Sequence, residues 1–232
     1  MRLAARPSVT AVTFEADAGP LGLAKWLTLV APGPGLLVLD GVLAANVQVG
    51  DRVATELLGA GDVIQPWNSD EAELVCEIDW RALVPTRFAV LDAAFWHRIE
   101  PWPQITLALL RRAGKRTRRL IVQRAISAQP RLEVRLVLLM WHLAARWGKV
   151  EPGGVRLELP LTHQLLGRLI SAERPSVSHA LARLGRSGLL TGHGDRWHLH
   201  GSVEDHLATM IEPPVSRVAQ LIEPVGLRTQ SR

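Results

Sequence analysis

The first half of the chain alternates short apolar runs with glycine-containing turns. Turn signals at Asp40-Gly41, Gly50-Asp51 and Gly61-Asp62 recur about every ten residues. This rhythm is typical of a compact antiparallel roll. The pattern therefore predicts an all-β domain over residues 23–100, after a loosely held arm at 1–22 that shows no clear periodicity. The apolar runs of the roll lie at residues 35–41, 42–51, 53–64, 73–84 and 87–96.

A helical period replaces the alternation after Pro101 and Pro103. Residues 104–127 read as one long helix in a segment spanning 101–128, with Arg and Lys around a seam at alternating spacings of four and three. A seam of this kind favours a partner helix, although a surface helix packed only on its own roll fits as well. The seam positions are Thr106, Leu110, Ala113, Thr117, Leu120 and Arg124, of which Leu110, Ala113, Thr117 and Leu120 are the candidate dimer contacts.

The segment 127–130 ends with a proline and predicts a hinge between two domains. Beyond it, residues 131–148 form a helical pattern with one apolar face. A turn at Gly153-Gly154 then leads into a short strand at 155–159.

Residues 159–201 have the pattern of a winged helix-turn-helix. Thr162 can cap a short helix with apolar residues at one-face spacing, and Pro175 suits the first turn of a second helix over about 174–187. That helix keeps Val177, Ala180 and Leu184 on one side and a basic, donor-rich face on the other. Gly188 predicts its end, and an alternating segment broken at Gly192, Gly194 and Asp195 predicts a two-stranded wing. The fold class is therefore α+β, with an N-terminal roll, a long helix, a winged domain over 129–204 and a tail at 205–232.

The stretch LTHQLLGRLISAERPSVSHALARLGRSGLL with its His-Gly wing closely resembles the DNA-binding domain of the bacterial CRP/FNR regulators, without gaps from Leu161 to Gly194. The resemblance implies a transcription regulator that binds a pseudo-palindromic site in double-stranded DNA. It also implies a cyclic-nucleotide-binding-like jelly roll, a parallel homodimer formed by the long helix, and RNA polymerase as a partner.

The second helix of such a domain enters the major groove. At the main base-reading positions of the family this chain has Arg174, Pro175 and His179. Arg174 is the candidate for a bidentate contact to guanine O6 and N7, and His179 is the next reader. The outer face also carries Arg183. The expected phosphate contacts, which position the domain without reading sequence, are Thr162, His163, Ser176, Ser178 and His193.

The roll departs from the relatives that bind cyclic AMP. LLGAGDVI, residues 57–64, resembles the strand and turn before their phosphate cassette. The cassette itself is replaced by Gln65, Pro66 and Trp67, and the later arginine position falls near Cys76. Leu120 and Ile121 stand where such relatives place a Thr-Ser pair that reaches the nucleotide. Acidic side chains that would repel a phosphate fill the same span, at Asp70, Glu71, Glu73, Glu77 and Asp79. We therefore predict that cyclic AMP is not a ligand and leave any other effector unknown.

Composition adds supporting evidence only. A net charge of +5 and a pI near 10.5 fit a polyanionic partner. The single cysteine, Cys76, excludes an internal disulfide framework or a thiolate cluster and is expected to be a small core residue, with a redox or haem role as the alternative.

No signal-like or membrane-spanning segment is evident, which predicts a cytoplasmic protein with no membrane partner. The tryptophans fit the core of the roll or an apolar ligand pocket; they are Trp26, Trp67, Trp80, Trp96 and Trp102.

Three other functions remain open. His193, His198 and His200 could make the regulator responsive to a metal, although no fixed Asp, Glu or Cys ligand is obvious and no metal site is predicted. Another small molecule could gate the protein, or the chain could be an architectural DNA-binding protein. Enzymatic activity is not expected, because the sequence has no G-x-S-x-G, Walker or H-E-x-x-H motif.

Overall fold

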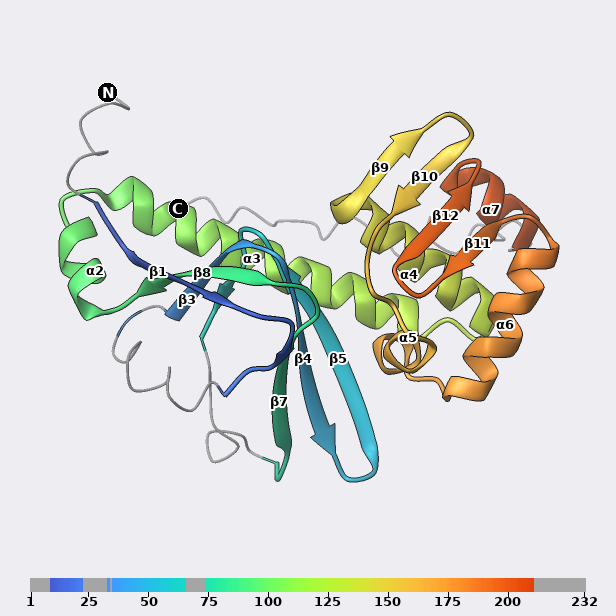
Figure 1. Cartoon of the computed structure of the whole chain (residues 1–232), viewed down its shortest axis with the longest axis horizontal. Coiled ribbons are helices and arrows are strands. Elements are labelled where there is room, and N and C mark those ends of the chain that lie inside the picture. Colours follow the sequence, from blue (N-terminus) through green and yellow to red (C-terminus); the bar gives the residue numbers. More distant parts are fainter. Residues whose placement is uncertain (1–8, 23–32, 34, 66–73, 211–232) are drawn as a thin grey trace, which may run out of the picture.

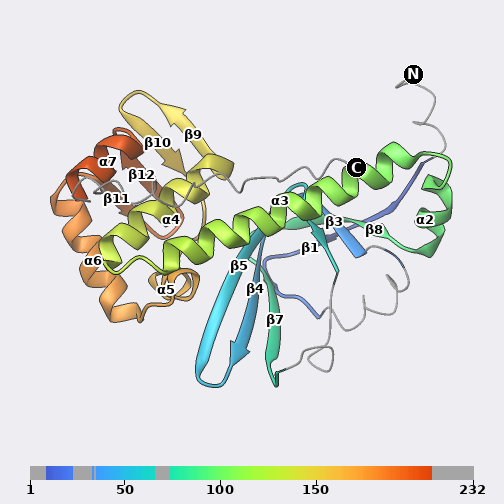
Figure 2. The same ribbon diagram turned by 180° about the vertical axis from the view of Figure 1, so that it is seen from behind.

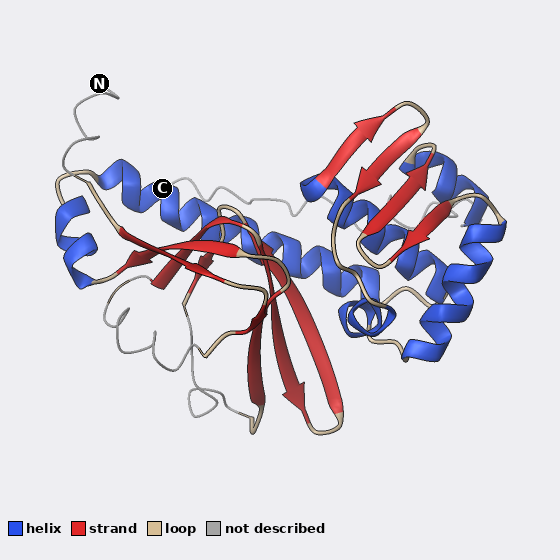
Figure 3. Ribbon diagram, viewed as in Figure 1, coloured by secondary structure: helices blue, strands red, loops and turns tan. Residues whose placement is uncertain are grey.

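The computed structural model describes residues 9–22, 33, 35–65 and 74–210. A β-roll and a helical domain with a small sheet are joined by one long helix (Figures 1 and 3). This arrangement confirms the predicted α+β class with a roll, a long helix and a winged domain.

Two antiparallel four-stranded sheets form the roll. The first has the order β1 (Val12–Ala16), β8 (Thr86–Leu91), β3 (Gly35–Asp40), β6 (Val63–Ile64). The second has the order β2 (Gly19–Pro20), β7 (Glu77–Ala82), β4 (Val42–Val49), β5 (Arg52–Gly59). Alternate residues of both sheets fill the core between them, including Leu36, Leu43, Leu58, Trp80 and Phe88.

Helix α2 (Ala93–Ile99) leads from the roll into α3 (Pro103–Ser127). The Asp92 carboxylate caps α2 by accepting a hydrogen bond from the Phe95 amide at 2.7 Å. Figure 2 shows α3 running along the outside of the roll with the strands behind it. In the part of the chain that the structure describes, no helix has the length and apolar character needed to cross a bilayer.

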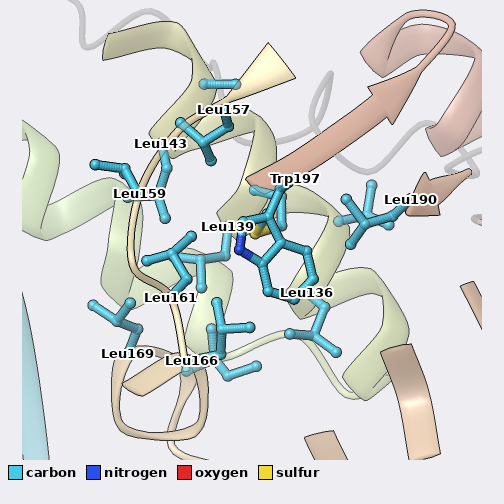
Figure 4. Packing of buried hydrophobic residues seen from close by; sticks show 14 of the residues in the cluster. Leu136, Leu139, Leu143, Leu157, Leu159, Leu161, Leu166, Leu169, Leu190 and Trp197 are labelled. Atoms are coloured by element: carbon cyan, nitrogen blue, oxygen red, sulfur yellow. The ribbon is translucent and has the colours of Figure 1, made fainter. Parts of the chain in front are cut away.

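The C-terminal domain comprises helices α4 (Leu132–Trp147), α5 (His163–Ile170), α6 (Arg174–Arg186) and α7 (Val203–Met210). Its sheet has the order β11 (Leu190–His193), β12 (Arg196–His200), β10 (Gly154–Leu157), β9 (Gly148–Glu151). Figure 4 shows the residues that hold these elements together, with Trp197 of the wing packed among leucines of α4 and α5. Leu139, Leu161 and Leu166 have no exposed surface. The core therefore fixes the wing and both helices of the motif to α4.

Several predictions need correction. The loosely held arm is wrong for residues 12–20, because β1 pairs with β8 and β2 pairs with β7. The last apolar run ends at Leu91, and Ala93 to Trp96 belong to α2. β9 was not predicted, and α7 extends the C-terminal domain beyond residue 204 because His206 is buried and accepts a hydrogen bond from the Trp141 indole at 3.1 Å.

The tryptophan and cysteine predictions have separate outcomes. Trp80 and Cys76 are buried, as expected of core residues, whereas Trp96 is 45% exposed. Trp26, Pro66 and Trp67, with the acidic residues Asp70, Glu71 and Glu73, lie outside the described residues.

The two domains share contacts through α3 and β5. The Gln123 side-chain amide donates to the carbonyl of Thr55 in β5 at 2.9 Å and to that of Leu169 in α5 at 3.1 Å. Val42, Ala44 and Leu57 of the roll belong to the same apolar cluster as the C-terminal domain. This contact sets the orientation of α5 and α6 relative to the roll.

Candidate nucleic-acid interface

A short turn joins α5 to α6 in the C-terminal domain. The Thr162 hydroxyl accepts a hydrogen bond from the Leu165 amide at 3.1 Å and caps α5, as predicted. Ser171 ends the helix in the left-handed region, with φ 56°; among the described residues it is the only non-glycine with a positive φ. The Ala172 amide then donates to the Gly167 carbonyl at 2.9 Å. The chain thereby reverses within three residues and α6 begins at Arg174.

Helix α6 separates a buried face from an exposed one. Val177, Ala180 and Leu184 are at most 2% exposed, as the apolar spacing predicted. Gly188 closes the helix with φ 70°: its amide donates to Gly185, and the amide of Leu189 donates to Leu184, both at 3.1 Å. The outer face carries the exposed candidates Arg174, Pro175, Ser176, His179 and Arg183.

Two predicted phosphate contacts are engaged inside the motif. His163 Nδ1 lies 2.8 Å from Ser178 Oγ, and the Ser178 hydroxyl donates to the Arg174 carbonyl at 3.0 Å. Both residues are half-buried, whereas Thr162 is exposed. His163 and Ser178 therefore brace α5 against α6 at the point where α6 begins.

Two acidic residues lie beside the outer face. Glu173, the residue before α6, pairs with Arg52 at the turn between β4 and β5, at 2.5 Å. Glu133 of α4 forms an ion pair with Arg183. Sequence reasoning did not identify either pair, because the partners come from other elements. Arg174 lies between these two pairs along α6 and forms no ion pair with any of the described residues.

The wing is anchored at its turn. The Gly194 carbonyl accepts hydrogen bonds from the Leu161 amide at 2.9 Å and from the Trp197 indole at 3.1 Å. His193 stands exposed at the end of β11, next to this turn. The wing therefore holds His193 close in space to the beginning of α5.

The other wing histidines contact their own sheet. The rings of His198 and His200 are 4.3 Å apart, and His200 Nε2 lies 2.7 Å from the Thr191 hydroxyl. Within residues 9–22, 33, 35–65 and 74–210, no group of three or more His, Cys, Asp or Glu side chains could hold a metal ion.

Helix α3 presents an apolar stripe away from the roll. Leu110 and Ile121 are 64% and 63% exposed, and Leu107 is 47% exposed. A Cβ added at Gly114, between them, would meet open space. Ala113 and Thr117 are also exposed, and Leu120 is 39% exposed while it lines a pocket between α3 and the roll. All four candidate dimer contacts are therefore exposed, and Ile121 follows Leu120 with a larger exposed fraction.

The pocket between α3 and the roll has a volume of about 410 Å³ and an apolar wall that includes Trp80 and Leu120. Arg116 also lines it, but its guanidinium forms two hydrogen bonds to the Glu56 carboxylate, at 2.8 and 2.7 Å. This contact raises the pKa of Arg116, because the bonded carboxylate stabilises the cation. A phosphate that binds Arg116 would compete with this ion pair; Arg124 and Arg168 also line the pocket.

Comparison with known proteins identifies a domain and a fold. The model of the Crp-like helix-turn-helix domain matches residues 134–200. FixK2 from Bradyrhizobium japonicum superposes with a TM-score of 0.64 at 15% identity, over 88% of this chain and 98% of that one. A CRP/FNR-family transcriptional regulator from Thermus thermophilus gives 0.61 at 18% identity, over 85% and 98%. The c-di-GMP-responsive global regulator CLP from Xanthomonas campestris gives 0.60 at 17% identity, over 85% and 97%. No curated protein matches.

Proposed function

The chain combines a Crp-like helix-turn-helix domain with the fold of the CRP/FNR transcription regulators, and from this we propose that it is a sequence-specific DNA-binding regulator. The observation that carries the proposal is the outer face of α6, which is exposed and basic while its inner face is fully buried. A helix held in this way can enter a major groove without disturbing the core behind it.

Arg174 is the residue we assign to base reading. It occupies the first turn of α6, and the first turn of a recognition helix approaches base edges most closely. Its planar guanidinium matches the O6 and N7 acceptors of guanine. His179 lies more than one turn further along the same helix. Pro175 offers no side-chain hydrogen bond, so the preferred site should differ from that of relatives with a hydrogen-bonding residue there.

The surrounding polar groups are assigned to the DNA backbone. The Thr162 oxygen accepts the capping bond, which leaves the hydroxyl hydrogen to donate to a phosphate. Ser176 and His193 are exposed as well. His163 and Ser178 act mainly by positioning α6. Arg183 is 57% exposed and pairs with Glu133 through Nη2, which leaves its other N–H groups to donate to a phosphate.

We infer that the regulator is a parallel homodimer formed through α3. The exposed stripe of Leu107, Leu110, Gly114 and Ile121, with Thr117, has the alternating spacing of three and four that brings two helices together. A dimer with two-fold symmetry would read two half-sites about 34 Å apart, one turn of DNA. RNA polymerase is the partner that a promoter-bound regulator would contact.

We also infer that cyclic AMP is not the effector. The pocket between α3 and the roll is lined by Trp80, Leu120 and three arginines, of which Arg116 is already paired to Glu56. Leu120 and Ile121 cannot form hydrogen bonds with a purine. Their apolar side chains support the prediction made from the altered cassette.

The test is selection of bound DNA from a random pool by the purified chain at about 0.15 M salt, because phosphate contacts weaken with salt. Enrichment of a two-fold site is the expected result. Arg174→Ala should then lose about 1–3 kcal/mol on that site and little on random DNA. Arg186→Ala, an exposed arginine at the other end of α6, is the matched control and should affect both DNAs alike. Failure to enrich any site without a ligand, and again in effector screens, would favour an architectural role.

A further inference from the structure

A basic pocket lies where α3, α4 and the turn between β5 and β6 meet. Its volume is about 590 Å³, within the range of small-molecule sites. Four of its lining residues repeat along one face of α3, namely Arg111, Arg112, Lys115 and Arg119, and Arg146 lines it from α4. No residue of α6 lines this basic pocket. It also has no lining residue in common with the pocket between α3 and the roll.

The positive charge of this basic pocket is mostly unneutralised. Asp62 is its one described acidic lining residue; its side chain is 2% exposed and forms ion pairs with Arg119 and Arg146. Arg112 donates to the Gly61 carbonyl at 3.0 Å. Arg111 and Lys115 are exposed, and no ion pair to either occurs among the described residues. Five cations therefore surround one carboxylate that is already shared.

Arg146 is held rigidly and has an unused donor. Its Nη2 donates to Asp62 at 2.7 Å, and its guanidinium lies 4.4 Å from the centre of the Trp147 ring. Its Nη1 is buried and has no hydrogen-bond partner within the part of the chain that the structure describes. A buried donor without a partner is costly, and this one belongs to a guanidinium that lines the basic pocket.

His142, which also lines the basic pocket, has a shifted pKa. Burial lowers the pKa of His142, and the charges of Arg119 and Arg146 lower it further. Burial likewise lowers the pKa of Arg146. At His142, burial and the two neighbouring arginines therefore act together against the protonated form.

We propose that this basic pocket binds a small molecule carrying two or more phosphate groups. Guanidinium groups match phosphate oxygens in pairs, and a diphosphate is large enough to contact cations of both helices. The ligand would touch α3 and α4, which lie on either side of the connection at residues 128–131. It would therefore act on the joint between the roll and the DNA-binding domain.

The probe is inorganic pyrophosphate, titrated into the full chain by calorimetry at about 0.15 M salt, where non-specific attraction is screened. Arg111→Ala and Lys115→Ala remove exposed cations without touching the Asp62 network. Each should weaken pyrophosphate binding about fivefold, as expected for one partly exposed charge contact. Arg118→Ala is the control, because Arg118 is exposed on the same helix but does not line the pocket.

Three results would overturn the proposal: no heat of binding, equal weakening by all three variants, or equal displacement by sulfate. If pyrophosphate does not bind but Arg111→Ala and Lys115→Ala weaken binding to random DNA, the pocket is a DNA backbone contact instead. The titration contains no DNA, so its outcome is independent of the proposed regulator function. If Arg111→Ala binds DNA as tightly as the wild type in the absence of pyrophosphate, the pocket binds pyrophosphate and does not contact DNA.

Discussion

Replacing Gly167 with alanine should destabilise the helix-turn-helix although alanine favours helices. Gly167 is a buried residue in α5. A Cβ at this position would approach the Ala172 carbonyl oxygen to under 3.0 Å, a distance that real Cβ atoms essentially never show. The obstacle is backbone, so a side-chain rotation cannot relieve it. The turn itself must move, and the hydrogen bond from the Ala172 amide to the Gly167 carbonyl is lost.

The expected magnitude combines three effects. Overpacking of a tight site costs about 1–3 kcal/mol, and the lost hydrogen bond costs about 1 kcal/mol. The higher helix propensity of alanine offsets about 1 kcal/mol. The net loss is about 1–3 kcal/mol, and each kcal/mol lowers the Tm of a chain of this size by about 2–4 °C.

Gly185→Ala is the matched control. Gly185 lies in α6, and a Cβ there would meet only the Leu190 carbonyl oxygen, at 3.7 Å. This variant should therefore be neutral or slightly more stable than the wild type. Thermal unfolding followed by circular dichroism measures both variants, and titration of the selected DNA site measures the displacement of α6. A Gly167→Ala variant as stable as Gly185→Ala would refute the geometric argument.

Three further outcomes are expected. Leu166→Ala should cost about 2–5 kcal/mol in denaturant unfolding, because Leu166 is fully buried and its removal leaves a cavity in the core shown in Figure 4; a smaller loss would mean that the core collapses around the site. Ile121→Glu should convert a dimer into a monomer in sedimentation, because it places a charge on the stripe of α3; a dimer that persists would place the interface elsewhere. The pKa of His142 is lowered in the folded chain from its ordinary value of 6.5, so the unfolded chain binds more protons as the pH falls below 6.5 and stability drops. His142→Gln should therefore make the Tm less dependent on pH between about 7 and 5, and an unchanged pH profile would contradict this.

The contact between the domains gives Gln123 a structural role that the sequence did not indicate. Its amide holds carbonyls of β5 and α5 at once. The Gln123 side chain and the shared apolar cluster therefore link α3 to α5, and α5 packs against α6.

The sequence alone determined the elements of the candidate interface. Thr162, Pro175 and Gly188 act on residues within five positions of themselves, and the apolar spacing of α5 and α6 is a property of each helix. These local signals located the turn, the exposed face of α6 and the wing. They also located α3, whose bounds differ by one residue from the prediction.

The tertiary structure decided what depends on contacts between distant parts of the chain. β1 forms a strand because it pairs with β8, although its own sequence has no clear alternation of apolar and polar residues. Asp62 joins Arg119 and Arg146, which follow it by 57 and 84 residues, and so forms a basic pocket that no local pattern indicates. The contact between His163 and Ser178 and the larger exposed fraction of Ile121 than of Leu120 also follow from how whole elements pack. Capping and periodicity act within a few residues, whereas strand pairing, ion pairs and helix orientation follow from which surfaces the folded chain brings together.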